Sequence, residues 1–455
     1  MRQTPNCVGK AEDYEISCKN MAQMAKEPKV SVGIVRSPRV VIDLRGAYVR
    51  RAVAAGQLTG RLVVEARGGH AMVSGEVADG WLLEPVDDGC RFDIHDVEIG
   101  IGFHWDRRER QTFGGALRFA VEGDEVWAVN VIGVEAYLTS VISSEMSATS
   151  DLELLKAHAI TSRSWLMSQV WGKGKFLGEQ KYALPSEVLT WRDREDHKLF
   201  DVCADDHCQR YQGLTRVSNA RVAKAVEDTR GLLLTYEGEV CDARFSKCCG
   251  GMTERFETCW AEDEHPYLRS FADAVMPPSG LPQDLTAETN ARQWIEARPD
   301  VFCNTSDAAT LRQVLNDYDQ KTTDFFRWSV TATGEELGRL MLSKGGHDIG
   351  VVTALEPLRR GPSGRILRLR VVGRRGQVII GKELEIRRLL SPTHLYSSAF
   401  TVSVSDGVFT LSGAGWGHGV GLCQIGAAVM ASKGFSHRSI LYHYFRRALI
   451  EKYWA

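Results

Sequence analysis

The strongest constraint on the fold is a glycine-rich stretch near the C-terminus, GAGWGHGVGLCQIG at residues 413–426. Glycine occupies every second position from Gly413 to Gly421, with Trp416 and His418 in the gaps. If this segment is extended, its glycines lie on one face and its larger side chains on the other. One face is then bare backbone that another chain segment or a sugar can approach closely. A simpler interpretation is that the glycines only let the strand cross beneath nearby helices.

The composition is that of a globular protein. The chain has 455 residues, of which 44% are hydrophobic and 25% charged, with a net charge of −2. This length suits about two or three domains. No broad basic field indicates nucleic acid as a partner, and no apolar run approaches the length that spans a bilayer. The first residues lack the apolar core of a secretory signal, so we expect either a cytoplasmic protein or one whose targeting segment is missing from the sequence.

The pattern of apolar residues changes along the chain. Residues 28–130 alternate short β-branched runs with glycine-containing turns, which predicts antiparallel strands. Apolar residues then follow the 3–4 spacing of a helix over 134–142, and a second helix is predicted after the capping residues 147–151. We expect an α+β fold. Its predicted parts are a strand-rich N-terminal region (1–125), a mixed core with central helices (126–276 and 346–455) and a helical insertion (277–345).

Glu145 ends the first predicted helix, where the partial negative charge of the helix C-terminus disfavours another anion. Stability alone does not select a carboxylate there, so Glu145 is a candidate general acid. On the second helix, Lys156 and Arg163 lie seven residues apart and share a face with small neighbours. The simpler interpretation is that all three side chains are solvated charges.

A short polar segment carries metal-ligand residue types. His197, Cys203, His207 and Cys208 lie within a dozen positions, and two imidazoles with two thiolates suit tetrahedral zinc. Four protein ligands leave no open position, so such a zinc ion would be structural. The alternative is a reduced loop with buried thiols and no metal.

A second group of cysteines follows at Cys241, Cys248, Cys249 and Cys259. Adjacent Cys248 and Cys249 rarely pair with each other, so we interpret these four cysteines as buried thiols. Cys423, within the glycine-rich stretch, is a weak candidate for a nucleophile because the sequence shows no base beside it.

Two long segments resemble one known family. VNVIGVEAYLTSVISSEMSATSDLELLKAHAITSRSWLM and the glycine-rich stretch, in that order, are similar to the two motifs of the sporulation stage II protein D family (SpoIID/LytB, or amidase enhancer). The resemblance covers most of residues 110–275 and 350–450. Ser246 stands where the family usually has histidine, and Cys423 where it often has serine.

The resemblance implies a function and a set of site residues. Enzymes of this family are lytic transglycosylases that cleave peptide-stripped peptidoglycan glycan strands, and the match places their catalytic acid at Glu145. It also implies a structural zinc ion in the His/Cys loop. The expected substrate-binding residues are Lys156, Arg163, Ser246, Trp416, His418 and Gln424. An alternative is a non-catalytic glycan-binding protein that stimulates a cell-wall amidase, and the family substrate implies the cell envelope as location.

Overall fold

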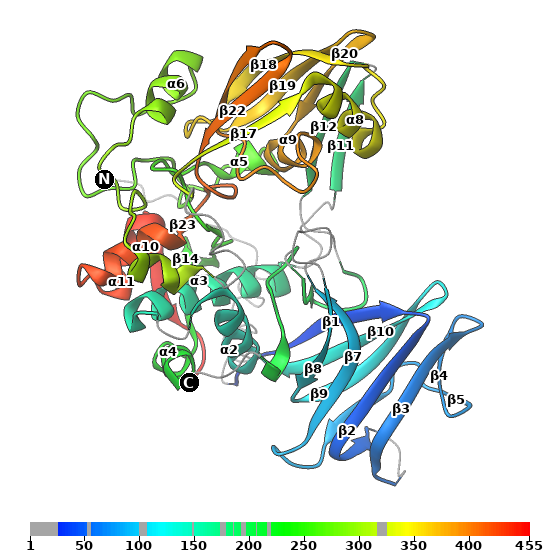
Figure 1. The fold of residues 1–455 in the computed structure, drawn as a ribbon. Helices are drawn as coiled ribbons and strands as arrows, with labels where there is room; N and C mark the ends of the chain where they lie inside the picture. The colour runs from blue at the N-terminus through cyan, green and yellow to red at the C-terminus, as the bar shows by residue number, and fades with distance from the viewer. Residues whose placement is uncertain are drawn as a thin grey trace, which may run out of the picture.

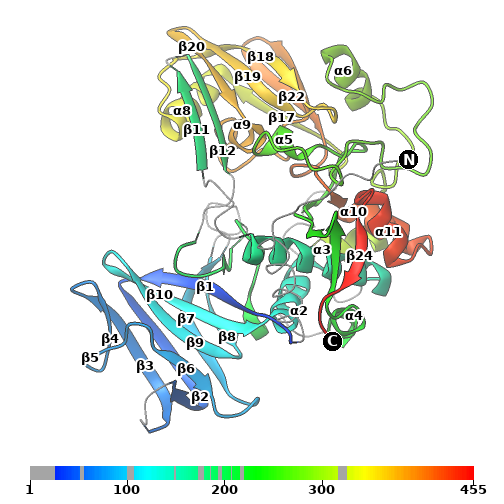
Figure 2. The same cartoon turned by 180° about the vertical axis from the view of Figure 1, so that it is seen from behind.

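The computed structural model describes residues 26–51, 56–99, 107–147, 150–172, 179–184, 186–192, 197–205, 207–215, 220–315 and 325–455. It confirms an α+β fold arranged in three tiers (Figure 1). A sheet built from the N-terminal strands forms one end, a group of helices forms the middle, and a second group of strands, with helices beside them, forms the other end. The view from behind shows the same order (Figure 2).

The N-terminal sheet is almost entirely antiparallel, in the order β13-β1-β10-β9-β6-β2-β3-β4-β5, with β7 pairing with both β2 and β8. Its one parallel pairing among the described strands joins β1 to β13, the short strand that carries Cys203. The sheet therefore holds the His/Cys loop at its edge. Its strands are β1 (Lys29–Ser37), β2 (Arg39–Arg50), β3 (Leu58–Arg67), β4 (His70–Val73), β5 (Glu76–Val77), β6 (Leu82–Pro85), β7 (Arg91–Ile99), β8 (Arg107–Phe113), β9 (Ala116–Glu122), β10 (Glu125–Gly133) and β13 (Val202–Cys203).

The middle tier contains the two helices that the spacing predicts. Helix α2 (Val134–Glu145) buries its apolar stripe completely, and Asp151 caps α3 (Leu152–Trp171) by accepting a hydrogen bond from the amide of Glu153 at 2.8 Å. Around them lie α4 (Ala220–Asp228), α7 (Ala308–Val314), α10 (Gln424–Ser432), α11 (His437–Tyr444), the 3₁₀ turn Gly213–Thr215, the sheet of β14 (Leu232–Tyr236), β15 (Glu239–Val240) and β24 (Leu449–Lys452), and the pair β16 (Phe245–Ser246) and β23 (Leu422–Cys423).

The third tier combines two sheets from distant parts of the chain. One has the order β11-β12-β20-β19-β18 and the other β17-β22-β21. The elements are β11 (Glu179–Leu184), β12 (Glu187–Arg192), β17 (Arg327–Thr333), β18 (Val352–Arg360), β19 (Ile366–Gly373), β20 (Gly376–Gly381), β21 (Phe400–Ser405) and β22 (Val408–Ala414), with α5 (Phe256–Cys259), α6 (Glu288–Glu296), α8 (Gly334–Gly345) and α9 (Glu383–Leu389).

The predicted helical insertion is only partly a separate unit. Strand β17 pairs along its full length with β22, from Arg327 opposite Ala414 to Thr333 opposite Val408. Helix α8 packs against β18 and α9. The second half of the 277–345 segment is therefore built into the C-terminal sheets, because β17 completes the backbone hydrogen bonding of β22.

No helix in the described part of the chain is both long enough and apolar enough to cross a membrane.

Candidate functional site

Glu145 is the last residue of α2 and its side chain is partly exposed, between the buried residues Ser144 and Met146. Within the described residues it has no hydrogen bond or ion pair. The turn after it is fixed, since the amide of Ser147 donates to the carbonyl of Gln313 at 2.9 Å, at the end of α7. The carboxyl group is therefore carried on a rigid support and left without a partner among the described residues.

The His/Cys loop holds the helix that carries Glu145. Tyr137 on α2 stacks on Tyr211, with ring centroids 5.0 Å apart, and its hydroxyl donates to Gln209 at 3.3 Å. The amide of Gln212 donates to the hydroxyl of Ser140 at 3.2 Å. These contacts fix α2 against the loop that contains the four predicted metal ligands.

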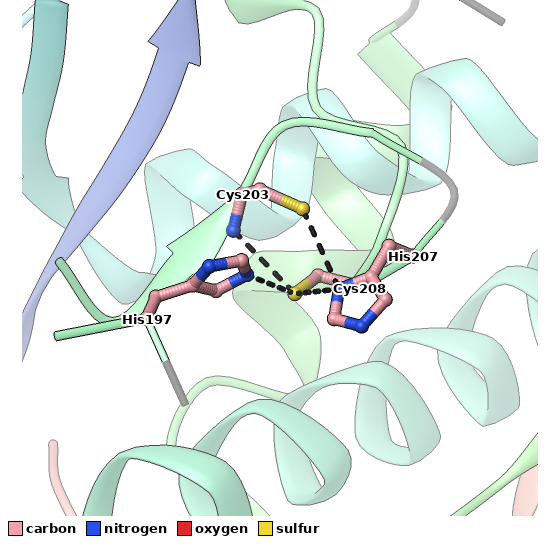
Figure 3. A group of neighbouring side chains, drawn as sticks. All are labelled: His197, Cys203, His207 and Cys208. Carbon is pink, nitrogen blue, oxygen red and sulfur yellow. Dashed lines mark hydrogen bonds between the residues drawn. The ribbon is translucent and has the colours of Figure 1, made fainter. Parts of the chain in front are cut away.

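The four predicted metal ligands do converge (Figure 3). Their donor atoms all lie within 4.8 Å of one another. The sulfur of Cys208 lies 3.5 Å from Nε2 of His197 and 3.5 Å from Nδ1 of His207, and the sulfur of Cys203 lies 3.8 Å from the same Nδ1. This set of two thiols and two imidazoles fits a tetrahedral zinc ion. Two of the four ligands, His207 and Cys208, are adjacent in the sequence.

The electrostatics of the loop also suit a cation. A hydrogen bond from Cys208, supported by His197 and His207, lowers the pKa of the Cys203 thiol to about 2. A thiolate is the form that binds metal. A cavity of about 610 Å³ lies beside the loop and is lined by Trp127, His197 and His207, whereas Glu145 does not line it.

The glycine-rich stretch is not the extended strand that its alternation predicts. Strand β22 ends at Ala414, and the four following glycines have positive φ angles: 79° at Gly415, 91° at Gly417, 75° at Gly419 and 72° at Gly421. Only glycine adopts this backbone region freely. The chain therefore changes direction at every second residue instead of continuing as a strand.

The glycines also predict that another group approaches the backbone closely. This occurs, and the approaching groups are other parts of the protein. A Cβ atom on Gly415 would lie 2.7 Å from the carbonyl oxygen of Cys248, and one on Gly421 would overlap the carbonyl of Arg244. At Gly419 it would overlap the guanidinium group of Arg365. The bare backbone is covered by residues 244–250 and by Arg365, so it is not a surface for sugar.

Trp416 lies among aromatic rings. Its ring stacks on Phe325 at 5.1 Å with an interplanar angle of 3°, and Tyr396 contacts it edge-on at 5.3 Å. Its backbone exchanges two hydrogen bonds with Cys248, at 2.8 and 3.0 Å. Trp416 is partly exposed, so this aromatic group presents ring surface that can stack on a sugar.

His418 is held on both sides by the protein. Its Nδ1 accepts a hydrogen bond from the amide of Val420 at 3.0 Å, and its ring contacts Trp260 edge-on at 4.8 Å. Burial, reinforced by the positive charges of Arg244 and Arg365, holds the pKa of His418 well below its usual range. A neutral, fixed imidazole of this kind shapes the glycine-rich turn and is not a proton donor near neutral pH.

Gln424 and Ser246 lie inside the molecule. Nε2 of Gln424 is 3.0 Å from Nε2 of His158, a residue of α3 that the sequence did not single out. Ser246 is buried beside Gly417, and its hydroxyl has no partner among the described residues. The expectation that these two residues contact substrate is therefore not supported by their burial.

Lys247 connects the two motifs. Its ammonium group donates to the carbonyl of Val314 at 2.8 Å, next to Gln313, which holds the turn after Glu145. The following residue, Cys248, pairs with Trp416. The end of α7 thus lies between the Glu145 turn and the segment that supports Trp416, which the sequence could not show.

Arg163 and Lys156 do not line a cleft. Arg163 is fully buried and forms a forked ion pair with Glu135, with a shortest distance of 2.5 Å. Lys156 bridges Glu153 at 3.3 Å and Asp228 at 3.2 Å. Both cations join α3 to its neighbours. This structural role replaces the expectation that Arg163 and Lys156 contact substrate.

These features define the class of protein: a three-tier α+β molecule whose central helix is anchored by a His/Cys loop and ends in a carboxyl group with no partner in the described part of the chain. Residues 122–236 match a family model described as stage II sporulation protein, and residues 254–421 match a domain of unknown function (DUF8618). The chain thus contains a region similar to the SpoIID/LytB family over residues 122–236.

Similar proteins agree with this assignment. The stage II sporulation protein D of Bacillus amyloliquefaciens is 24% identical over 70% of this chain and 74% of its own. An uncharacterised protein of Brachyspira hyodysenteriae is 26% identical over 74% of this chain and 72% of its own. The amidase enhancer of Bacillus subtilis is 26% identical over 70% of this chain and 40% of its own length.

Proposed function

We propose that the protein acts on the bacterial cell wall as a lytic transglycosylase that cleaves peptidoglycan glycan strands, with Glu145 as general acid and base. The observation that carries the proposal is the partly exposed carboxyl group of Glu145, which has no partner among the described residues and is fixed at the end of α2. Similarity to a family whose names refer to sporulation and to an amidase supports the substrate class.

A single carboxyl group suffices for this reaction. The protonated acid gives its proton to the bridging glycosidic oxygen as the bond to C1 breaks. The resulting carboxylate then takes a proton from the 6-hydroxyl of the muramic acid residue, whose oxygen closes onto C1. A 1,6-anhydro end forms and Glu145 returns to its acid form, so neither a second carboxylate nor a water nucleophile is required.

The aromatic group around Trp416 supplies binding contacts in this proposal. Stacking of a sugar ring on an aromatic side chain and hydrogen bonding to its hydroxyls are the usual means of holding glycans. The substrate implies the cell envelope as the place of action. Zinc in the His/Cys loop is structural in this scheme, because it would fix α2 through Tyr211 and Gln212.

The test is digestion of purified, peptide-free glycan strands, followed by mass spectrometry of the products. The wild-type chain should yield 1,6-anhydro ends, and Glu145→Gln should reduce the yield by about 10²–10⁴-fold, the usual contribution of a general acid and base. Glu296→Gln is the matched control, since Glu296 also ends a helix and is exposed. Equal yields from the two variants would contradict the proposal.

A second candidate is a glycan-binding enhancer of a cell-wall amidase, which the similarity to the amidase enhancer favours. In that case glycan binding persists in Glu145→Gln and no product forms with any variant. Pull-down of the chain on insoluble glycan, together with an amidase assay with and without it, separates the two functions.

A further inference from the structure

A second cluster of metal-ligand residues lies away from the His/Cys loop, in the core beneath the glycine-rich stretch. The donor atoms of Cys249, Asp273, Cys303 and Cys423 all lie within 4.8 Å of one another, and all four residues are buried. The thiol of Cys248 also contacts the thiols of Cys303 and Cys423. Three thiols and a carboxyl group therefore surround one point, with the thiol of Cys248 beside them, although the sequence separates the four residues by up to 174 positions.

We propose that Cys249, Cys303 and Cys423, with Cys248 or Asp273 as the fourth donor, form a second structural metal site that binds zinc or a similar soft divalent ion.

The spacing of the sulfur atoms fits this assignment. The sulfur atoms of Cys249 and Cys303 are 3.5 Å apart, and Oδ2 of Asp273 is 3.5 Å from the sulfur of Cys249. In a tetrahedral site with Zn–S bonds of about 2.3 Å, neighbouring sulfur atoms lie about 3.8 Å apart. All nine described cysteines are free, so no disulfide joins these thiols in the structure.

The backbone around Cys423 favours a thiolate. Its sulfur accepts hydrogen bonds from the amides of Cys249 at 3.2 Å and Gly426 at 3.5 Å. Cys423 is also the N-cap of α10, where the positive end of the helix dipole stabilises negative charge.

The surroundings of Asp273 resemble the outer shell of a metal site. Its Oδ1 accepts a hydrogen bond from the hydroxyl of Tyr444 at 2.9 Å and lies 3.1 Å from Nε2 of His443. Its Oδ2 lies toward Cys249. A carboxylate with one oxygen held by hydrogen bonds and the other directed at the donor cluster is the arrangement that orients metal ligands.

A buried cation beside the cluster lacks a carboxylate partner. Arg327 is buried and donates to backbone carbonyls, including those of Gly250 and Trp294, and it pairs with no carboxylate of the described residues. Its charge interacts with the thiols of Cys303 and Cys248. A zinc ion bound by four anionic ligands carries a net charge of −2, which Arg327 would partly balance.

The site would join three parts of the chain that support Trp416. Cys248 and Cys249 follow β16, Cys303 follows α6, and Cys423 precedes α10. Because the backbone of Cys248 pairs with Trp416, the ion would fix the glycine-rich turn against the segment that follows β16.

The test is the metal content of the purified chains, measured by elemental mass spectrometry. The wild type, Cys203→Ser/Cys208→Ser and Cys303→Ser/Cys423→Ser are compared, with Cys241→Ser as control because Cys241 is buried outside both clusters. We expect the Cys303/Cys423 variant to lose one ion per chain relative to wild type and the control to lose none. Unchanged metal content in the Cys303/Cys423 variant would overturn the proposal.

A second measurement does not depend on that variant folding. The Cys203→Ser/Cys208→Ser chain keeps the second cluster intact, so titration with Co²⁺ should give thiolate-to-cobalt charge-transfer absorption that saturates at one ion per chain. Adding Cys248→Ser weakens this absorption if Cys248 is the fourth ligand, and adding Asp273→Asn weakens binding if Asp273 is. Absence of the absorption, or a disulfide among these four cysteines in peptide maps of the unreduced wild type, would overturn the proposal.

Discussion

Nε2 of Gln424 lies 3.0 Å from Nε2 of His158, so the last motif of the chain is joined to the second central helix by one buried hydrogen bond. Burial, with the nearby charge of Lys247, lowers the pKa of His158 to about 3. The ring is therefore neutral at pH 7. The Gln424 amide donates to its unprotonated Nε2, and Nδ1 lies 3.2 Å from the hydroxyl of Ser162.

Replacing Gln424 should destabilise the protein. Gln424→Leu leaves the buried Nε2 of His158 without a donor, and an unpaired buried polar atom costs about 1–3 kcal/mol. Denaturant unfolding measures this loss. The exposed change Gln293→Leu on α6 should cost less than about 0.5 kcal/mol. Equal losses would show that the hydrogen bond contributes nothing specific.

The stability should depend on pH through His158. Its folded pKa of about 3 lies below the usual value of 6.5, so its contribution to stability is complete above pH 6.5 and is lost as pH falls toward 3. The slope from this residue is at most about 1.4 kcal/mol per pH unit. Between pH 6.5 and 4.5, the unfolding free energy of His158→Gln should fall less steeply than that of wild type. If the unfolding free energies of wild type and His158→Gln change in parallel with pH, the low folded pKa of His158 is contradicted.

Replacing a glycine of the C-terminal motif by alanine should destabilise the protein more than the same change at a turn glycine with a similar φ angle. Gly421 and Gly407 have φ angles of 72° and 76°, but a Cβ on Gly421 would overlap the carbonyl of Arg244, whereas Gly407 has nothing within 4 Å. Gly407→Ala should cost only the left-handed strain of about 1–2 kcal/mol. Gly421→Ala should cost clearly more, measured by thermal unfolding. Equal costs would mean that the backbone around Arg244 moves freely to make room for the added Cβ atom.

The buried ion pair of Arg163 and Glu135 should contribute to stability and not to binding. Arg163→Met leaves the buried Glu135 carboxylate with only Trp454 and the amide of Gly231 as hydrogen-bond donors among the described residues, and such a loss costs about 3–5 kcal/mol. Lys156→Met, which breaks a more exposed pair, should cost about 1 kcal/mol or less. Unfolding measurements compare the two. Loss of glycan binding by folded Arg163→Met would contradict the structural role.

The sequence predicted elements where one physical pattern dominates. Helix α2 was predicted because its apolar residues repeat with helical spacing, and the start of α3 because capping residues precede it, of which the structure uses Asp151. The convergence of His197, Cys203, His207 and Cys208 was predicted because they lie within one loop.

Other features depend on contacts that spacing does not encode. Alternating glycines fit an extended strand and a chain of left-handed turns equally, and only packing against Arg244 and Arg365 selects the turns. The burial of His158 against Gln424 was missed because the two residues lie 266 positions apart in the sequence. The sequence did not reveal that Arg163 is buried in an ion pair, because its partner Glu135 lies on another helix. Cys303 joins the other thiols across 54 residues of chain, which no local motif indicates.

The most direct test of the proposed activity is the amount of 1,6-anhydro ends released from peptide-free glycan strands by wild type, Glu145→Gln and Glu296→Gln at equal concentrations of folded protein. We predict that wild type and Glu296→Gln release equal amounts and that Glu145→Gln releases about 10²–10⁴-fold less. Release by Glu145→Gln at the wild-type level would contradict the assignment of Glu145 as the acid and base.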